Sequence, residues 1–62
     1  MNIKVNGTLR VVEEEATLHS LVPSARGVAV ALNGAVVPAA AWHDTRLSEN
    51  DAVEVVTAHQ GG

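Results

Sequence analysis

The chain contains no cysteine, so disulfide bonds and thiolate metal sites are excluded. It also has no phenylalanine or tyrosine and one tryptophan among its 62 residues, so its core must be aliphatic. A chain of this length buries only about 60% of the surface that its unfolded form exposes. We therefore expect one small domain, near the lower size limit for a fold without disulfide or metal support.

Basic residues are few and scattered, and the formal net charge is −3. A phosphate-binding surface needs clustered cations, and single strands of nucleic acid need aromatic rings on which bases stack. These absences argue against nucleic-acid binding. The apolar stretches are too short to span a bilayer, and the first residues lack the apolar core of a signal peptide, so we expect a cytoplasmic protein without membrane attachment.

The Asn6-Gly7 pair predicts a tight hairpin turn, because both residue types tolerate positive φ. Before it, Ile3 and Val5 alternate with polar residues, which is the period of a strand with one buried face. The chain then returns as a second strand, in which we expect Leu9 and Val11 to face the core. The acidic triplet that follows is predicted to be a solvated loop.

Thr17 is a plausible N-cap, and Leu18 and Leu21 follow it at helical spacing. Pro23 cannot continue a helix comfortably, so we expect a short helix that ends between residues 22 and 25.

The second half of the chain reads as strands. Residues 28–32 and 35–37 are predicted strands around a second hairpin signal, Asn33-Gly34. A single helical or 3₁₀ turn is expected to place Trp42 over the core. The last strand is predicted at residues 53–57.

The predicted order is strand, strand, helix, strand, strand, strand. Such a chain packs as an α+β roll in which a mixed sheet of four to five strands covers one short helix. In about sixty residues this is the pattern of the ubiquitin-like β-grasp. We expect the domain to span residues 1–58 and a flexible Gly-Gly tail to span residues 59–62.

Gly61 and Gly62 end the sequence directly after the last predicted strand and a short lead. Glycine has no Cβ, so a narrow channel in a partner can admit this backbone closely. A tail of about five residues can reach roughly 15 Å from the domain. We expect Gly62 to offer a bare carboxylate to a partner enzyme and Gly61 to give clearance around it.

Several short stretches match one known family in order along the chain. They are Met1-Asn2-Ile3, Asn6-Gly7, Thr17-Leu18, residues 28–34, Val36-Val37-Pro38, Trp42, Leu47, Asp51, residues 53–58 and Gly61-Gly62. In these features the whole chain resembles the ThiS family, the small sulfur carrier proteins of thiamine (thiazole) biosynthesis. Pro23-Ser24 in the helix region, Asn50-Asp51 before the last strand and His59-Gln60 before the glycines depart from the family pattern.

The resemblance implies that the carboxylate of Gly62 is adenylated and converted to a thiocarboxylate. It implies two partners, a ThiF-like adenylating enzyme and a ThiG-like thiazole synthase that accepts the sulfur. ATP and magnesium would be used by the activating enzyme, and no cofactor would be bound by the chain itself. We expect a carrier that is acted on by enzymes and is not an enzyme, monomeric when free.

A partner surface is predicted beside the tail. In the last strand Val53 and Val55 should face the core, which turns Val56 outward. The candidate contact residues are Val56, Ala58, His59 and Gln60. An ordinary exposed valine is the alternative interpretation, because isolated apolar residues are common on protein surfaces.

No other chemistry is favoured by the sequence. His19, His43 and His59 lack the spacing of paired metal ligands. A Ser-His-Asp arrangement from Ser20, His43 and Asp44 lacks a nucleophile elbow. We expect neither a catalytic residue nor a metal site.

Three other functions stay open at this point. One is a neighbouring sulfur carrier, such as a MoaD-like subunit of molybdopterin synthase or a carrier for amino-acid or tRNA thiolation; those chains are longer and MoaD-like ones are richer in aromatic residues. The second is a ubiquitin-like modifier that forms isopeptide bonds. The third is an interaction module whose glycines are incidental.

Overall fold

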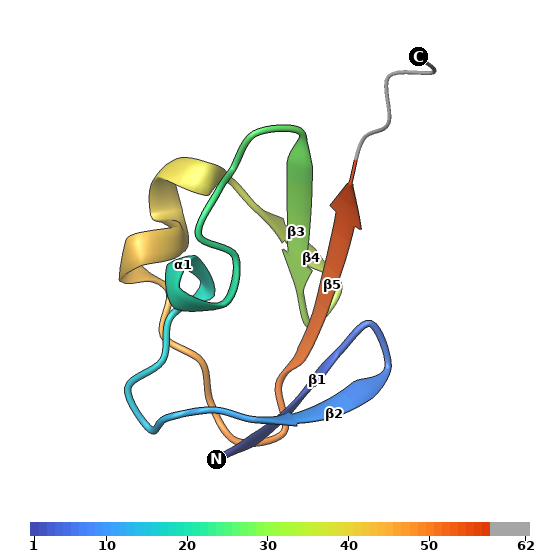
Figure 1. Cartoon of the computed structure of the whole chain (residues 1–62), viewed down its shortest axis with the longest axis vertical. Helices are drawn as coiled ribbons and strands as arrows, with labels where there is room; N and C mark the ends of the chain where they lie inside the picture. Colours follow the sequence, from blue (N-terminus) through green and yellow to red (C-terminus); the bar gives the residue numbers. More distant parts are fainter. Residues whose placement is uncertain (58–62) are drawn as a thin grey trace.

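The computed structural model describes residues 1–57 (Figure 1). Ala58 and the predicted tail at 59–62 lie outside the described residues, so the expected boundary at residue 58 stays a prediction. The elements are β1 (Asn2–Val5), β2 (Thr8–Val11), α1 (Leu18–Leu21), β3 (Val28–Leu32), β4 (Ala35–Val37), the 3₁₀ helix η1 (Ala39–Asp44) and β5 (Ala52–Thr57).

The strands form one mixed sheet in the order β2-β1-β5-β3-β4. β1 and β5 are parallel, whereas β1 with β2, β3 with β4 and β3 with β5 are antiparallel. The first and last strands of the chain are therefore neighbours at the centre of the sheet. This arrangement confirms the predicted ubiquitin-like β-grasp.

Both predicted hairpin turns are present. Asn6 and Gly7 have φ values of 51° and 81°, and Asn33 and Gly34 have φ values of 50° and 88°. These are the positive values that a two-residue turn of this kind needs at both positions, and asparagine and glycine adopt them most readily. The local sequence therefore fixes where each hairpin turns.

The helix is capped as predicted and ends slightly earlier than predicted. The Thr17 Oγ1 accepts from the backbone N–H of Ser20 at 3.3 Å, and the Ser20 Oγ accepts from the backbone N–H of Thr17 at 3.0 Å. The helix ends at Leu21, since Val22 lies outside the helical region with φ −129° and ψ 86°. The ring of Pro23 disfavours helical dihedrals at the residue before it, which accounts for this stop.

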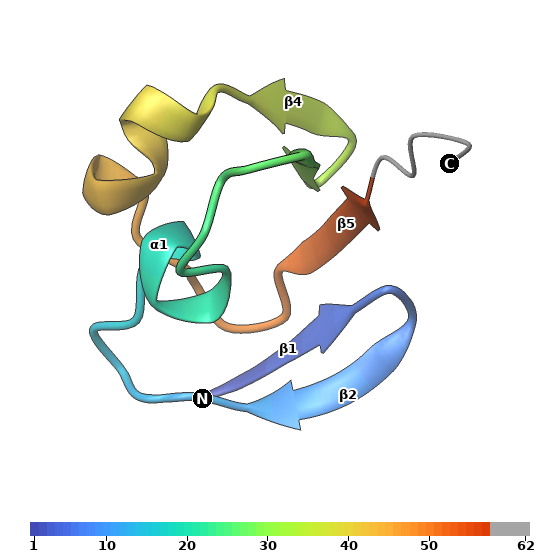
Figure 2. The same cartoon turned by 45° about the horizontal axis from the view of Figure 1, so that its top comes forward.

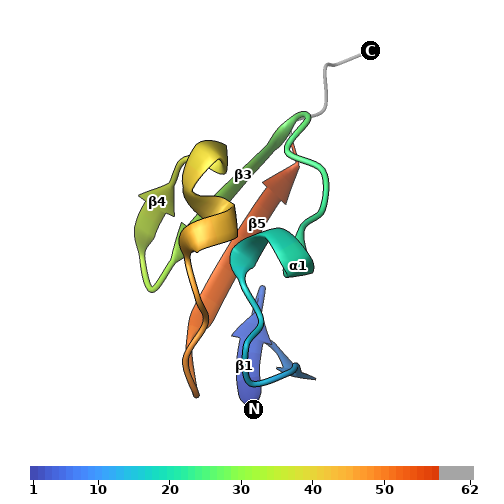
Figure 3. The same ribbon diagram turned by 90° about the vertical axis from the view of Figure 1, so that its left-hand side faces the viewer.

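One face of the sheet is covered by α1 and η1, which lie on the same side of it (Figures 2 and 3). We call this side the covered face. Its core consists of Ile3, Leu18, Val30, Trp42, Leu47 and Val53. The 3₁₀ helix places Trp42 in that core as predicted, and the indole Nε1–H donates to the carbonyl oxygen of Val37 at 2.8 Å. Within residues 1–57, no helix has the length and apolar character needed to cross a membrane.

Candidate functional site

β5 is the strand that leads toward the predicted functional terminus. It lies between β1 and β3, and its last residue, Thr57, is paired with Val28. It pairs with β1 near its start and with β3 as far as Thr57. The end of β5 therefore has a defined position relative to the sheet. The residues proposed to carry the chemistry, Gly61 and Gly62, lie outside the described residues, as do Ala58, His59 and Gln60.

The asparagines of the two hairpin turns both bind β5. Asn6 accepts from the backbone N–H of Val55 through Oδ1 at 2.8 Å and donates through Nδ2 to the Val55 carbonyl at 3.2 Å. Asn33 accepts from the backbone N–H of Ala52 through Oδ1 at 2.9 Å and donates to the carboxylate of Asp51 at 3.0 Å. Each asparagine thus takes the turn conformation and also positions the last strand.

The face of the sheet opposite the helices is uncovered, and we call it the open face. The strand register assigns residues to it, because directly paired residues point to the same side of a sheet. Leu9 pairs with Lys4, Val56 with Ala29, and Val36 with Ala31. The open face therefore collects the exposed large apolar side chains, which are Leu9 (62%), Val11 (77%), Val36 (77%) and Val56 (63%).

The prediction for β2 was wrong. Leu9 and Val11 do not face the core; both are exposed on the open face. The two-residue turn pairs Val5 with Thr8, so Leu9 falls opposite Lys4 rather than opposite a core residue. The Asn6-Gly7 signal contained this register and would have given the correct face.

The prediction for β5 was correct. Val53 is 1% exposed, Val55 is half-buried against the core, and Val56 points away from it with 63% of its surface exposed. Val56 pairs with Ala29 and lies on the same face of the sheet as three other large exposed apolar side chains, on β2 and β4. Sequence reasoning missed those three as part of a surface.

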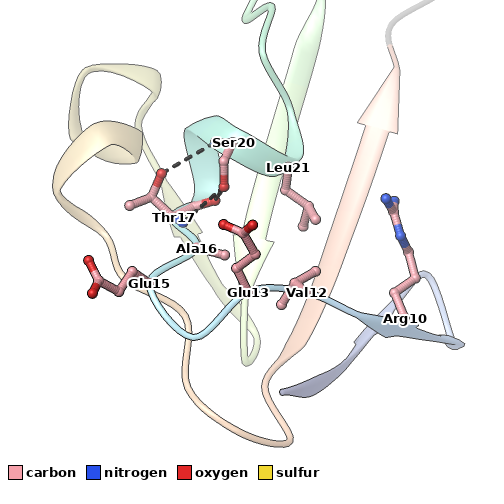
Figure 4. A pocket seen from close by; sticks show the side chains of 8 residues that line it. All are labelled: Arg10, Val12, Glu13, Glu15, Ala16, Thr17, Ser20 and Leu21. Atoms are coloured by element: carbon pink, nitrogen blue, oxygen red, sulfur yellow. Dashed lines mark hydrogen bonds between the residues drawn. The ribbon is translucent and has the colours of Figure 1, made fainter.

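A groove borders β2 on the covered side (Figure 4). It has a volume of about 330 Å³. We call it the edge groove, and its lining residues are Arg10, Val12, Glu13, Glu15, Ala16, Thr17, Ser20 and Leu21. Its walls combine the end of β2, the acidic loop and the first turn of α1.

Two of the three histidines are brought together by the fold. The rings of His19 in α1 and His43 in η1 are stacked with 3.7 Å between their centroids and 21° between their planes. Stacked rings direct their nitrogen lone pairs side by side, which is unlike the convergent arrangement of metal ligands. Among the described residues no group of three or more His, Cys, Asp or Glu side chains is placed to hold a metal ion.

Comparison with known proteins agrees with this architecture. The ThiS family matches residues 3–62 of the chain. A crystal structure of the thiamine biosynthesis protein ThiS from Geobacter metallireducens is 35% identical, with a TM-score of 0.82 and complete coverage of both chains. No curated protein matches the chain. On the match over nearly its whole length, together with the fold, this chain belongs to the ThiS family.

Proposed function

We propose that this chain is a sulfur carrier protein of thiamine biosynthesis, whose Gly62 carboxylate is activated and then loaded with sulfur. The observation that carries the proposal is the family match, which extends over residues 3–62 and so includes the glycine pair. The likeness to a thiamine biosynthesis protein over the full length of both chains supports the same pathway.

The proposed chemistry follows from the weakness of a carboxylate as an acyl donor. Attack on it must expel an oxide from a resonance-stabilised anion. A ThiF-like enzyme would transfer AMP from magnesium-bound ATP to the Gly62 carboxylate, releasing pyrophosphate and leaving a mixed anhydride. A sulfur nucleophile then displaces AMP and leaves a thiocarboxylate, from which a ThiG-like thiazole synthase takes the sulfur.

In this proposal the chain is a protein co-substrate. The partner enzyme supplies the positioning and charge stabilisation of the reacting atoms, and the carrier supplies an accessible acyl group. Gly61 leaves room around that group because it has no side chain. The body of the domain contributes a rigid base, since β5 is bonded to β1, to β3 and to the side chains of Asn6 and Asn33.

The open face is the proposed docking surface for the adenylating enzyme. Val56 lies on the same strand that leads to the tail, one residue before Thr57. Exposed apolar side chains gathered on one uncovered face are a feature of interaction sites, and the open face carries four large ones. Ala58, His59 and Gln60 continue from this strand and are proposed as further contacts.

The test is tandem mass spectrometry after incubation with ATP, magnesium, a ThiF-like enzyme and a sulfide source. Fragments are needed because oxidation of Met1 adds nearly the same mass as the exchange of one carboxyl oxygen for sulfur. We expect the sulfur gain in the fragment that contains Gly61 and Gly62, and none in a control chain that lacks Gly62. An unmodified terminus, with the enzyme active on another carrier, would exclude the thiocarboxylate mechanism. An isopeptide adduct would indicate a modifier instead.

A further inference from the structure

β2 is an outermost strand of the sheet, and all four of its residues are exposed. An outer strand offers unpaired backbone N–H and C=O groups to any second strand. The opposite outer strand, β4, is shorter by one residue and is followed by Pro38, which has no N–H to donate. β2 is therefore the more open of the two edges.

The hydrogen bonds of the first hairpin show which backbone groups face outward. Met1 and Val12 exchange both backbone bonds, at 2.6 and 2.9 Å. Bonded and non-bonded pairs alternate along an antiparallel ladder, so Arg10 bonds inward to β1. Leu9 and Val11 consequently direct their N–H and C=O groups to the free edge.

The side chains beside this edge are apolar at one end and positively charged at the other. Arg10 and Val12 point to the covered side of β2 and line the edge groove. Figure 4 shows Val12 and Leu21 together at the centre of the groove, with the guanidinium of Arg10 beyond them. A peptide segment bound along β2 would thus have apolar surface at Val12 and the positive charge of Arg10 within reach of its side chains.

Most of the other polar side chains of the groove are already engaged. Thr17 and Ser20 bond each other in the helix cap, and Glu15 lies 3.3 Å from the guanidinium of Arg46. Glu13 also lines the groove and has no ion-pair partner among residues 1–57, but Figure 4 shows it on the far side of Val12 and Leu21 from Arg10. Within residues 1–57, Arg10 has no carboxylate within 4.0 Å. The charge available to recruit an acidic partner group is therefore that of Arg10.

We propose that the edge of β2 is a strand-addition site for an extended peptide segment of a partner protein. The segment runs antiparallel to β2 and bonds to the backbone of Leu9 and Val11. Its apolar residue lies opposite Val12 and Leu21, and an acidic residue two positions later lies opposite Arg10. Backbone bonds supply affinity in such complexes, and alternate side chains supply specificity.

The geometry sets this spacing. A residue opposite Val12 and a residue opposite Arg10 are two apart in an antiparallel partner, and both occupy non-bonded pairs in which side chains approach most closely. A second copy of this chain fits poorly. The register in which both Leu9 and Val11 of each copy bond the other copy places Arg10 directly opposite Arg10, and like charges directly opposite each other are destabilising.

The experiment uses the isotope-labelled chain and three short capped peptides. The first has the sequence Thr-Ile-Thr-Asp-Thr, the second is its reverse with the same composition, and the third replaces Asp by Lys. Binding is followed by amide chemical shifts and hydrogen exchange. We expect the first peptide to bind with millimolar affinity and to slow exchange at the amides of Leu9 and Val11, with little change at Arg10, which is already bonded within the sheet.

A charge reversal tests the role of Arg10. Arg10→Glu should weaken binding of the Asp peptide about fivefold and make the Lys peptide the better ligand. The matched control is Arg26→Glu, which changes net charge equally in an exposed loop residue outside the groove. Equal binding of the forward and reversed peptides, or shifts confined to the open face, would overturn the proposal. Since no adenylating enzyme is used, this result is independent of the sulfur-carrier proposal.

Discussion

The two faces of the sheet use similar side chains for opposite purposes. On β5, Val53 is 1% exposed on the covered face, and Val56 is 63% exposed on the open face. The neighbouring strands repeat the contrast, because Val30 is buried and Val36 is exposed. One face therefore supplies the hydrophobic stabilisation of the fold, and the other keeps apolar surface in contact with water.

The contrast matters because the domain is small. Its buried core consists of Ile3, Leu18, Val30, Trp42, Leu47 and Val53. With so little buried area, each of these side chains contributes a large share of a stability that is marginal in any small domain. Four large apolar side chains nevertheless stand on the open face instead of in the core, and this is the face that we propose as a docking surface.

The largest expected effect comes from the covered face. Trp42→Ala removes the largest core side chain and its hydrogen bond to Val37, so the free energy of unfolding should fall by about 3–5 kcal/mol. Urea titration followed by far-ultraviolet circular dichroism measures this fall without needing the tryptophan signal. Val36→Ala on the open face is the control, expected to stay within about 0.5 kcal/mol of the parent chain. Similar losses in both variants would abolish the distinction between the faces.

Two substitutions on β5, one on each face of the sheet, distinguish an effect on stability from an effect on docking. Val53→Ala should cost about 2 kcal/mol of unfolding free energy, because it removes two buried methyl groups. Val56→Asp should leave the unfolding free energy almost unchanged and lower the rate of adenylation by a ThiF-like enzyme at least about tenfold, since a carboxylate would be buried in an apolar interface.

The control for this pair places the same charge elsewhere. Ala40→Asp adds one negative charge at an exposed position of η1, on the opposite side of the domain. It should be adenylated at the parent rate. A folded Val56→Asp variant that is also adenylated at the parent rate would remove the open face from the docking model.

Local signals in the sequence predicted local structure well. Asn6-Gly7 and Asn33-Gly34 located both hairpins, because few residue types adopt positive φ at two consecutive positions. Thr17 located the start of the helix, since its hydroxyl satisfies a backbone N–H that the helix leaves free. These features depend on interactions within a few residues, which a sequence displays directly.

Features that depend on distant residues were harder to predict. Val11, which ends β2, is followed directly by a second apolar residue, Val12, so alternation by itself gave the wrong face for Leu9 and Val11. The stacking of His19 on His43 joins two residues that are 24 positions apart, and no local pattern in the sequence indicates it. The edge groove likewise arises only when β2 and α1 are placed side by side.

The smallest expected effect concerns Asn6 and Asn33, whose side chains bond to the backbone of β5. This strand carries Val53 on the covered face and Val56 on the open face. Asn6→Gly keeps the positive φ of the turn and removes only the side chain, so it isolates the two bonds to the backbone of Val55. We expect a loss of about 1 kcal/mol in unfolding free energy and faster hydrogen exchange at the Val55 amide.

Asn33→Gly is the matched variant and should instead accelerate exchange at Ala52, whose N–H it leaves without its side-chain acceptor. If Asn6→Gly accelerates every amide equally, the side chain stabilises the whole fold and does not specifically position β5. A localised effect at Val55 would mean that the turn of the first hairpin holds the segment between Val53 on the covered face and Val56 on the open face, so that one asparagine fixes the orientation of both.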